Sequence, residues 1–193
     1  MKKIILLIFI ISTTSCSILQ IKNPQNVKEL LPIGSILHLT KKIIIPKDRF
    51  FIYIANGNVI PLKKYNTVNI YEPHCMLYLN KEASFQRKVL VDDFKVTKII
   101  ELERSFSKLD VMNMAKIDQE KSSFVKTGFP GDDGGPSIVM YATILSLHSD
   151  KQPDVEQLVC GHWNDPFQIE PLTLEEMKSA LGDLILIGKS IAA

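Results

Sequence analysis

Short apolar runs separated by turn-forming residues dominate the first half of the chain. Runs of this length that are rich in β-branched and aromatic residues are typical of β-strands. Asn56-Gly57 stands between two of the runs and predicts a tight hairpin, because both residues tolerate positive φ. The pattern predicts strands over Ile36–Leu39, Ile43–Ile45, Phe50–Ala55 and Val59–Ile60.

The central part of the chain continues this pattern with the segments Val68–Leu79, Val89–Val91 and Phe94–Ile100. Because side chains alternate along a strand, each segment should present an apolar face. The side chains expected on one face of the first segment are Cys75, Leu77 and Leu79. Those expected on one face of the third are Phe94, Val96 and Ile100.

Two further strands are predicted late in the chain. Ile138–Leu147 is apolar on both faces, as a central strand would be. The segment Ser149–Pro153 is expected to form a turn, and the pattern of Val155–Trp163 predicts a second strand. We expect these two strands to form a hairpin.

One helix is predicted near the C-terminus. Thr173 is expected to be its N-cap, and Glu176, three residues later, completes a capping box. Leu172 and Met177 are placed for a hydrophobic staple, and Leu184–Ile187 could add a final strand. The chain is therefore expected to be mainly β, a single β-sandwich or small barrel-like domain with one C-terminal helix.

Residues 101–136 break the strand pattern, being polar and without a sustained period, and a long loop is expected there. The loop ends in Gly131–Pro136, which resembles the nucleophile loop of trypsin-like serine proteases. Asp133 occupies the place of the nucleophilic serine, and a carboxylate cannot perform that serine's acyl chemistry. Asp132 and Asp133 could instead serve acid–base catalysis, bind calcium, or form a solvated turn.

Residues 1–16 have the layout of a secretory signal. Lys2 and Lys3 precede the apolar run Ile4–Ile11, and small hydroxyl residues lead from it to Cys16. This ending resembles the lipobox of bacterial lipoproteins, with Thr13 at the position where lipoboxes prefer leucine. The resemblance implies cleavage before Cys16 and acylation of that cysteine.

The lipobox resemblance also divides the chain into three parts. Residues 1–15 would be the signal peptide, residues 16–32 a lipidated tether, and residues 33–193 the β-rich periplasmic domain. Ser17, rather than aspartate, follows the lipidated cysteine, which resembles lipoproteins sent to the outer membrane. We therefore expect a protein attached by its lipid to the periplasmic face of the outer membrane.

The charge of the chain limits its partners. The net charge is +2, from 23 basic and 21 acidic residues. Without Lys2 and Lys3 the numbers of basic and acidic residues are equal. Nucleic-acid binding needs many basic contacts to phosphate, so a near-neutral chain without a basic stripe argues against it. The same balance argues against docking on anionic lipid by charge alone.

Three cysteines fit an oxidising compartment. If Cys16 is lipidated, Cys75 and Cys160 remain, and an even pair in an exported protein indicates a disulfide. Buried free thiols, a thiolate nucleophile, or a metal site with His74 and His162 are the alternatives. The metal site is disfavoured because His74 and Cys75 point to opposite faces of a strand.

Trp163 and Phe167 could form a recognition surface, since aromatic anchors dominate binding hot spots, or could cap the end of the core. The chain after Cys16 is also loosely similar to small uncharacterised lipoproteins of Gram-negative bacteria. That similarity rests on Ile45-Pro46, Asn56-Gly57, Cys75, Cys160 and Ala180-Leu181-Gly182. It implies no activity.

These features favour a non-catalytic periplasmic lipoprotein that binds or scaffolds an envelope protein partner, without metal or other cofactor. One alternative is a small periplasmic hydrolase that uses the Asp132–Asp133 loop or a histidine. The other is an enzyme inhibitor that acts through residues 101–136.

Overall fold

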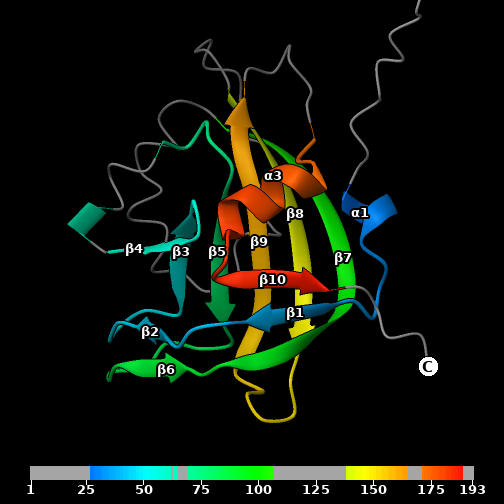
Figure 1. Cartoon of the computed structure of the whole chain (residues 1–193). Coiled ribbons are helices and arrows are strands. Elements are labelled where there is room, and N and C mark those ends of the chain that lie inside the picture. The colour runs from blue at the N-terminus through cyan, green and yellow to red at the C-terminus, as the bar shows by residue number, and fades with distance from the viewer. Residues whose placement is uncertain (1–26, 62, 65–68, 107–137, 165–170, 189–193) are drawn as a thin grey trace, which may run out of the picture.

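Eight strands of the computed structural model form one curled sheet, a half-barrel in which every pair of neighbours is antiparallel (Figure 1). The structure describes residues 27–61, 63–64, 69–106, 138–164 and 171–188. The strand order across the sheet is β10-β1-β7-β8-β9-β5-β3-β4. The strands are β1 Ile36–Leu39, β3 Phe51–Ala55, β4 Asn58–Ile60, β5 His74–Leu79, β7 Asp92–Phe106, β8 Ile138–His148, β9 Val155–Asn164 and β10 Ile185–Gly188.

A second, two-stranded sheet lies at one end of the half-barrel, at the lower left of Figure 1. It consists of β2 (Ile43–Ile45) and β6 (Arg87–Val89), paired antiparallel. Alternation along these short strands buries the side chains of Ile43, Ile45 and Val89 in the core. The opposite face of this sheet is exposed.

Helix α3 (Leu174–Leu181) packs against β3, β5, β9 and β10, crossing in front of the curled sheet in Figure 1. Its N-cap is Thr173, whose hydroxyl accepts from the backbone N–H of Glu176, while the Glu176 carboxylate accepts from the Thr173 backbone N–H. The predicted capping box is therefore confirmed. Leu172 and Met177, the pair expected to form the staple, are both buried in the same core.

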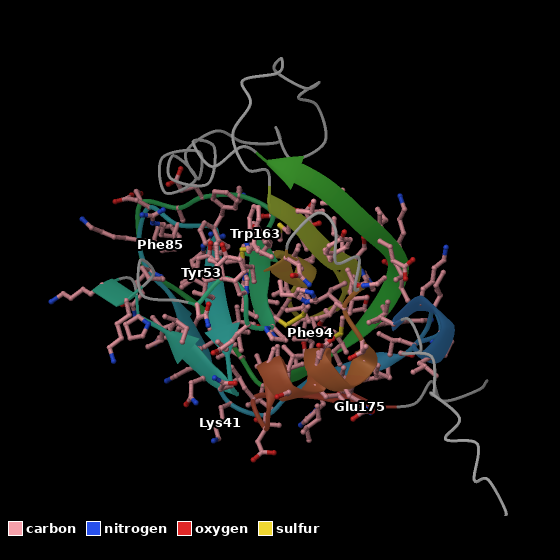
Figure 2. The ribbon with its side chains drawn as sticks, turned by 90° about the horizontal axis from the view of Figure 1, so that it is seen from above. Lys41, Tyr53, Phe85, Phe94, Trp163 and Glu175 are labelled. Carbon is pink, nitrogen blue, oxygen red and sulfur yellow. A yellow bond between two sulfur atoms is a disulfide. The ribbon has the colours of Figure 1, made fainter. Side chains whose placement is uncertain are left out.

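Strand alternation divides the apolar side chains between two clusters. The inner core lies between the concave face of the sheet, α3 and the β2–β6 sheet, and includes Phe94, Leu77 and Leu158. The outer cluster lies on the opposite face of the sheet and contains Phe51, Met76, Met140, Ala142, Val159 and Trp163. Figure 2 labels Phe94 from the inner core and Trp163 from the outer cluster.

The Asn56-Gly57 turn confirms the hairpin prediction and also contacts the helix. Both residues have positive φ, as a tight turn between β3 and β4 requires. The Gly57 N–H donates to the Ala180 carbonyl at 2.9 Å, and a Cβ on Gly182 would lie 2.6 Å from the Gly57 Cα. The two glycines thus let the hairpin turn approach the end of α3.

The mainly β fold with a C-terminal helix is as predicted, and three details of the prediction are wrong. The strand expected over Val68–Leu79 begins only at His74, because residues 69–72 form a turn closed by the Glu72 N–H and the Asn69 carbonyl. The long loop expected over residues 101–136 begins later, since β7 continues to Phe106 in register with β8. Residues 107–137 lie outside the described part of the chain.

The third correction concerns Ile100, which does not share a face with Phe94 and Val96. The register between β7 and β8 shifts between Val96 and Lys98, as a β-bulge does. One extra residue reverses the alternation, so Phe94 and Val96 are buried while Ile100 is exposed on the other face.

The packed domain begins earlier than residue 33, the first residue after the expected tether of residues 16–32. The short helix α1 (Val27–Leu30) and the residue after it place Val27 and Leu31 in the inner core. Among the residues that the structure describes, no helix has the length and apolar character needed to cross a bilayer.

Candidate functional site

Cys75 of β5 and Cys160 of β9 face each other directly in the antiparallel register and form a disulfide. Their Cα atoms are 4.0 Å apart, and both residues are buried in the inner core. The pair predicted from the sequence is therefore within bonding distance, and its sulfur atoms are not available as metal ligands. No three His, Cys, Asp or Glu side chains gather in a metal-binding arrangement within the described ranges.

A small pocket opens beside the C-terminal end of β9 and is the candidate binding site. Its volume is about 150 Å³. A cavity of this size accommodates a group about as large as benzene, so the pocket suits one side chain or a small molecule. Its lining residues are Tyr71, Pro73, His162, Trp163, Asn164 and Glu176.

Three segments that are distant in the sequence meet at this pocket. Strand β9 supplies His162 and Trp163, whose side chains leave opposite faces of the strand. The Trp163 N–H donates to the Ile70 carbonyl at 2.9 Å, which holds the turn before β5 against β9. The capping box places Glu176 in the first turn of α3, on the remaining side.

Gly161 lets β8 and β9 approach closely next to the pocket. A Cβ at this position would lie 2.4 Å from the Tyr141 carbonyl oxygen and 2.9 Å from the Ala142 Cβ. Both contacts are shorter than real Cβ contacts, and the first involves backbone that cannot move aside easily. The position of His162 therefore depends on a glycine preceding it.

His162 supplies a buried polar atom that lacks a partner. The residue is only 6% exposed, and its Nδ1 makes no hydrogen bond to any described residue. Leaving such an atom unpaired costs about 1–3 kcal/mol. His162 thus carries a buried hydrogen-bonding atom without a partner among the described residues, and the same residue lines the pocket.

Glu176 supplies the negative charge of the pocket. Its Oε2 accepts from the Thr173 backbone N–H at 2.8 Å and from the Thr173 hydroxyl at 2.9 Å. Its Oε1 takes part in neither of these two bonds. A carboxylate oxygen in the pocket lining suits a ligand that donates hydrogen bonds, such as an amine, an amide or a guanidinium.

His74 is a second buried imidazole close to the pocket, at the start of β5. Burial lowers the pKa of His74 below its ordinary value, and the neighbouring His162 lowers it further. A hydrogen bond between Nδ1 and the Glu72 carbonyl, 3.0 Å long, opposes the shift. His74 is therefore expected to be neutral near pH 7.

The other residues singled out from the sequence have different outcomes. Trp163 is buried in the outer cluster, as expected of a residue at the end of a core, and it also lines the pocket. Its role in recognition stays a prediction. Phe167, Asp132, Asp133 and Cys16 lie outside the described residues.

Sequence reasoning missed most of the pocket. His162 was considered as a metal ligand, and Glu176 only as a capping residue. No sequence pattern pointed to Tyr71 or Asn164 as pocket residues. Each reaches the pocket only because segments that are distant in the sequence lie side by side in the fold. The buried histidine next to Cys160-Gly161 in an apolar strand was the one available clue.

A second polar cluster joins the start of β7 to the β8–β9 turn. The buried Asp92 carboxylate accepts from the Ser149 hydroxyl at 2.5 Å and from the Gln152 amide at 3.1 Å. The hydrogen bond from Ser149 is the largest cause that lowers the pKa of Asp92 below its ordinary value, although burial opposes it. Gln152 also bonds both backbone groups of Leu90, so this cluster fixes the start of β7 against the β8–β9 turn.

Comparison with known proteins adds no further assignment: no family model matches the chain, and neither the curated proteins nor the solved structures give a match.

Proposed function

We propose that the chain is an exported binding protein, held by a lipid on Cys16 at the periplasmic face of the outer membrane. The observation that carries this proposal is the disulfide between Cys75 and Cys160. Disulfides persist in oxidising compartments such as the periplasm and are rare in reducing ones. The disulfide therefore supports export independently of the signal-like pattern that ends at Cys16.

Binding, rather than catalysis, is the role that the pocket favours. Its described lining offers aromatic, imidazole, amide and carboxylate groups, and no serine, threonine or cysteine nucleophile is among them. Its volume of about 150 Å³ suits a single inserted group. The ligand that fits best is a hydrogen-bond-donating side chain of an envelope protein, contacting Glu176 and His162.

Site-specific photo-crosslinking in cells tests this proposal. A crosslinking amino acid would replace Tyr71, an exposed residue that lines the pocket, or Leu186, an exposed residue of β10, as the control. We expect a discrete adduct from position 71 that is absent from position 186 and is reduced by Glu176→Gln. Glutamine can still serve at the third position of a capping box, so this change removes the charge and keeps the helix cap.

Equal adducts from both positions, or none from position 71, would contradict a binding role for the pocket. A catalytic role is distinguished by a panel of ester, peptide and glycan substrates. Reproducible turnover that Asp133→Ala abolishes would replace the binding proposal with the hydrolase alternative.

A further inference from the structure

The two segments that build the β2–β6 sheet concentrate positive charge at one end of the domain. Residues 41–49 and 81–89 contain seven basic and two acidic side chains, a net charge of +5, whereas the whole chain has +2. The basic side chains are Lys41, Lys42, Lys47, Arg49, Lys81, Arg87 and Lys88. The charge is therefore segregated, although the chain as a whole is close to neutral.

These two segments form one structural unit. Besides the β2–β6 pairing, the Asp48 N–H donates to the Ala83 carbonyl at 2.7 Å. The Arg87 guanidinium donates to the backbone carbonyls of Arg49 and Lys81. The positive charge of Arg87 is therefore hydrogen-bonded to neutral carbonyl groups and is not neutralised by a carboxylate.

The acids near this surface leave part of its charge uncompensated. Within the two segments the acids are Asp48 and Glu82. Asp48 forms an ion pair with Lys47, at 4.0 Å between exposed side chains. The adjoining β8–β9 turn adds Asp150, Lys151 and Asp154. Lys151 pairs with Asp92 at 3.7 Å, and Asp93 follows Asp92 directly. With these acids and the turn included, this end of the domain keeps a net charge of +2.

Exposed apolar side chains lie among these cations. Ile44, on the outer face of β2, is 46% exposed and is the cross-strand partner of Lys88. Phe85, just before β6, is 65% exposed, and Leu90 and Val91, just after it, are also exposed. In Figure 2, Phe85 lies at the upper left and Lys41 near the bottom, left of the centre, both in the half of the molecule where Figure 1 shows β2 and β6.

We propose that this cationic and apolar surface, defined by β2, β6 and the residues that flank them, docks on an anionic lipid surface. Basic side chains are attracted to anionic headgroups, and exposed apolar side chains gain by entering the boundary between headgroups and acyl chains. Nucleic acid would use the charge but gain little from Ile44 and Phe85, since phosphate contacts dominate that binding.

The docking surface goes beyond the proposed lipid anchor and does not depend on it. Cys16 would hold the protein at a membrane, whereas the surface would orient the domain on it. The expectation that charge would not direct the chain to anionic lipid rested on its overall balance. In the fold, basic residues gather around β2 and β6, and the net charge of the whole chain does not reveal this local excess.

Vesicle co-sedimentation tests the docking surface with the full chain carrying Cys16→Ser, which removes the acylation site. The vesicles are phosphatidylcholine with or without phosphatidylglycerol. We expect binding that is strengthened by phosphatidylglycerol and weakens as salt is added, because salt screens exposed charges. The apolar run Ile4–Ile11 is common to all variants, so differences between variants report on the surface.

The decisive variant is Lys42→Gln with Lys88→Gln. Each basic side chain near an anionic membrane strengthens binding about five-fold, so this pair should weaken it about 25-fold. The matched control is Lys95→Gln with Lys98→Gln on the exposed face of β7, which removes the same charge elsewhere and should change binding little. Ile44→Ser with Phe85→Ser should also weaken binding, and melting curves would verify that each variant is folded.

Three results would overturn the docking surface: a loss from Lys42→Gln with Lys88→Gln that is the same with and without phosphatidylglycerol, equal losses from the two lysine pairs, or polyglutamate that displaces the vesicles fully. The last would assign the surface to an acidic protein partner. Failure here leaves the proposed anchor untouched, since lipidation is read from the mass of the N-terminus.

Discussion

Asp92 shows how a single buried residue makes the stability of this protein depend on pH. The Ser149 hydroxyl stabilises its charged form, and the Gln152 amide adds to this effect. A carboxyl group with a lowered pKa contributes stability that is present above the unfolded value, 3.8. That contribution is lost as the pH falls through the lower pKa of the folded state.

Ser149→Ala should therefore destabilise the protein near pH 7 by about 1–3 kcal/mol, because it leaves a buried carboxylate short of a donor. The loss should shrink below pH 3.8, where Asp92 is protonated in the unfolded chain. Urea unfolding at a series of pH values measures both effects. Ser84→Ala, at an exposed position, is the control, and equal losses from the two variants would contradict the role of Ser149.

Gly161→Ala is expected to be more harmful than its size suggests. The new Cβ would lie 2.4 Å from the Tyr141 carbonyl oxygen, so β8 and β9 would have to separate next to the pocket. Overpacking of this kind costs about 1–3 kcal/mol or more. Gly188→Ala is the matched control, since its Cβ would make an ordinary 3.5 Å contact with the Ile36 carbonyl oxygen. A thermal melt in which both variants match the wild type would contradict the close approach.

Strand positions were largely predictable at the scale of elements, because alternation and turn residues are local signals. Asn56-Gly57, the β8–β9 hairpin and the capping box at Thr173 all appear where the sequence places them. The β-bulge near Thr97 was not predictable, because a bulge inserts a residue without changing composition. Because of this bulge, Ile100 lies on the opposite face of the sheet from the one predicted.

The disulfide joins two elements that local patterns cannot pair. It links β5 to β9 across a sequence separation of 85 residues. On the chain-entropy model, closing such a loop stabilises the fold by roughly 4–5 kcal/mol. Cys75→Ala and Cys160→Ala should each lower the melting temperature, and the double variant should be no worse than either single one.

Non-reducing peptide mapping of the exported protein should find Cys75 joined to Cys160. Reduction of the wild type should lower its melting temperature to that of the variants. Two cysteines that alkylate freely in the native exported protein would contradict the disulfide.

The whole molecule combines what the sequence predicts with what only the fold reveals. A mainly β domain with one late helix follows from strand-length apolar runs and one helix start signal. The order of strands does not follow, because alternation assigns side chains to faces and not strands to neighbours. The pocket and the cationic surface were missed for the same reason, since each joins separate segments: Ile70, His162 and Glu176 in one case, β2 and β6 in the other.

Export and lipid attachment are the central claim, and the mass of the N-terminal peptide tests them most directly. The wild-type protein would be isolated from its native envelope and analysed by mass spectrometry beside Cys16→Ala. The proposal predicts a wild-type chain that starts at Cys16 and carries added acyl mass, and a variant that is released or mislocalised. A wild-type N-terminus that is uncleaved and unmodified would contradict it.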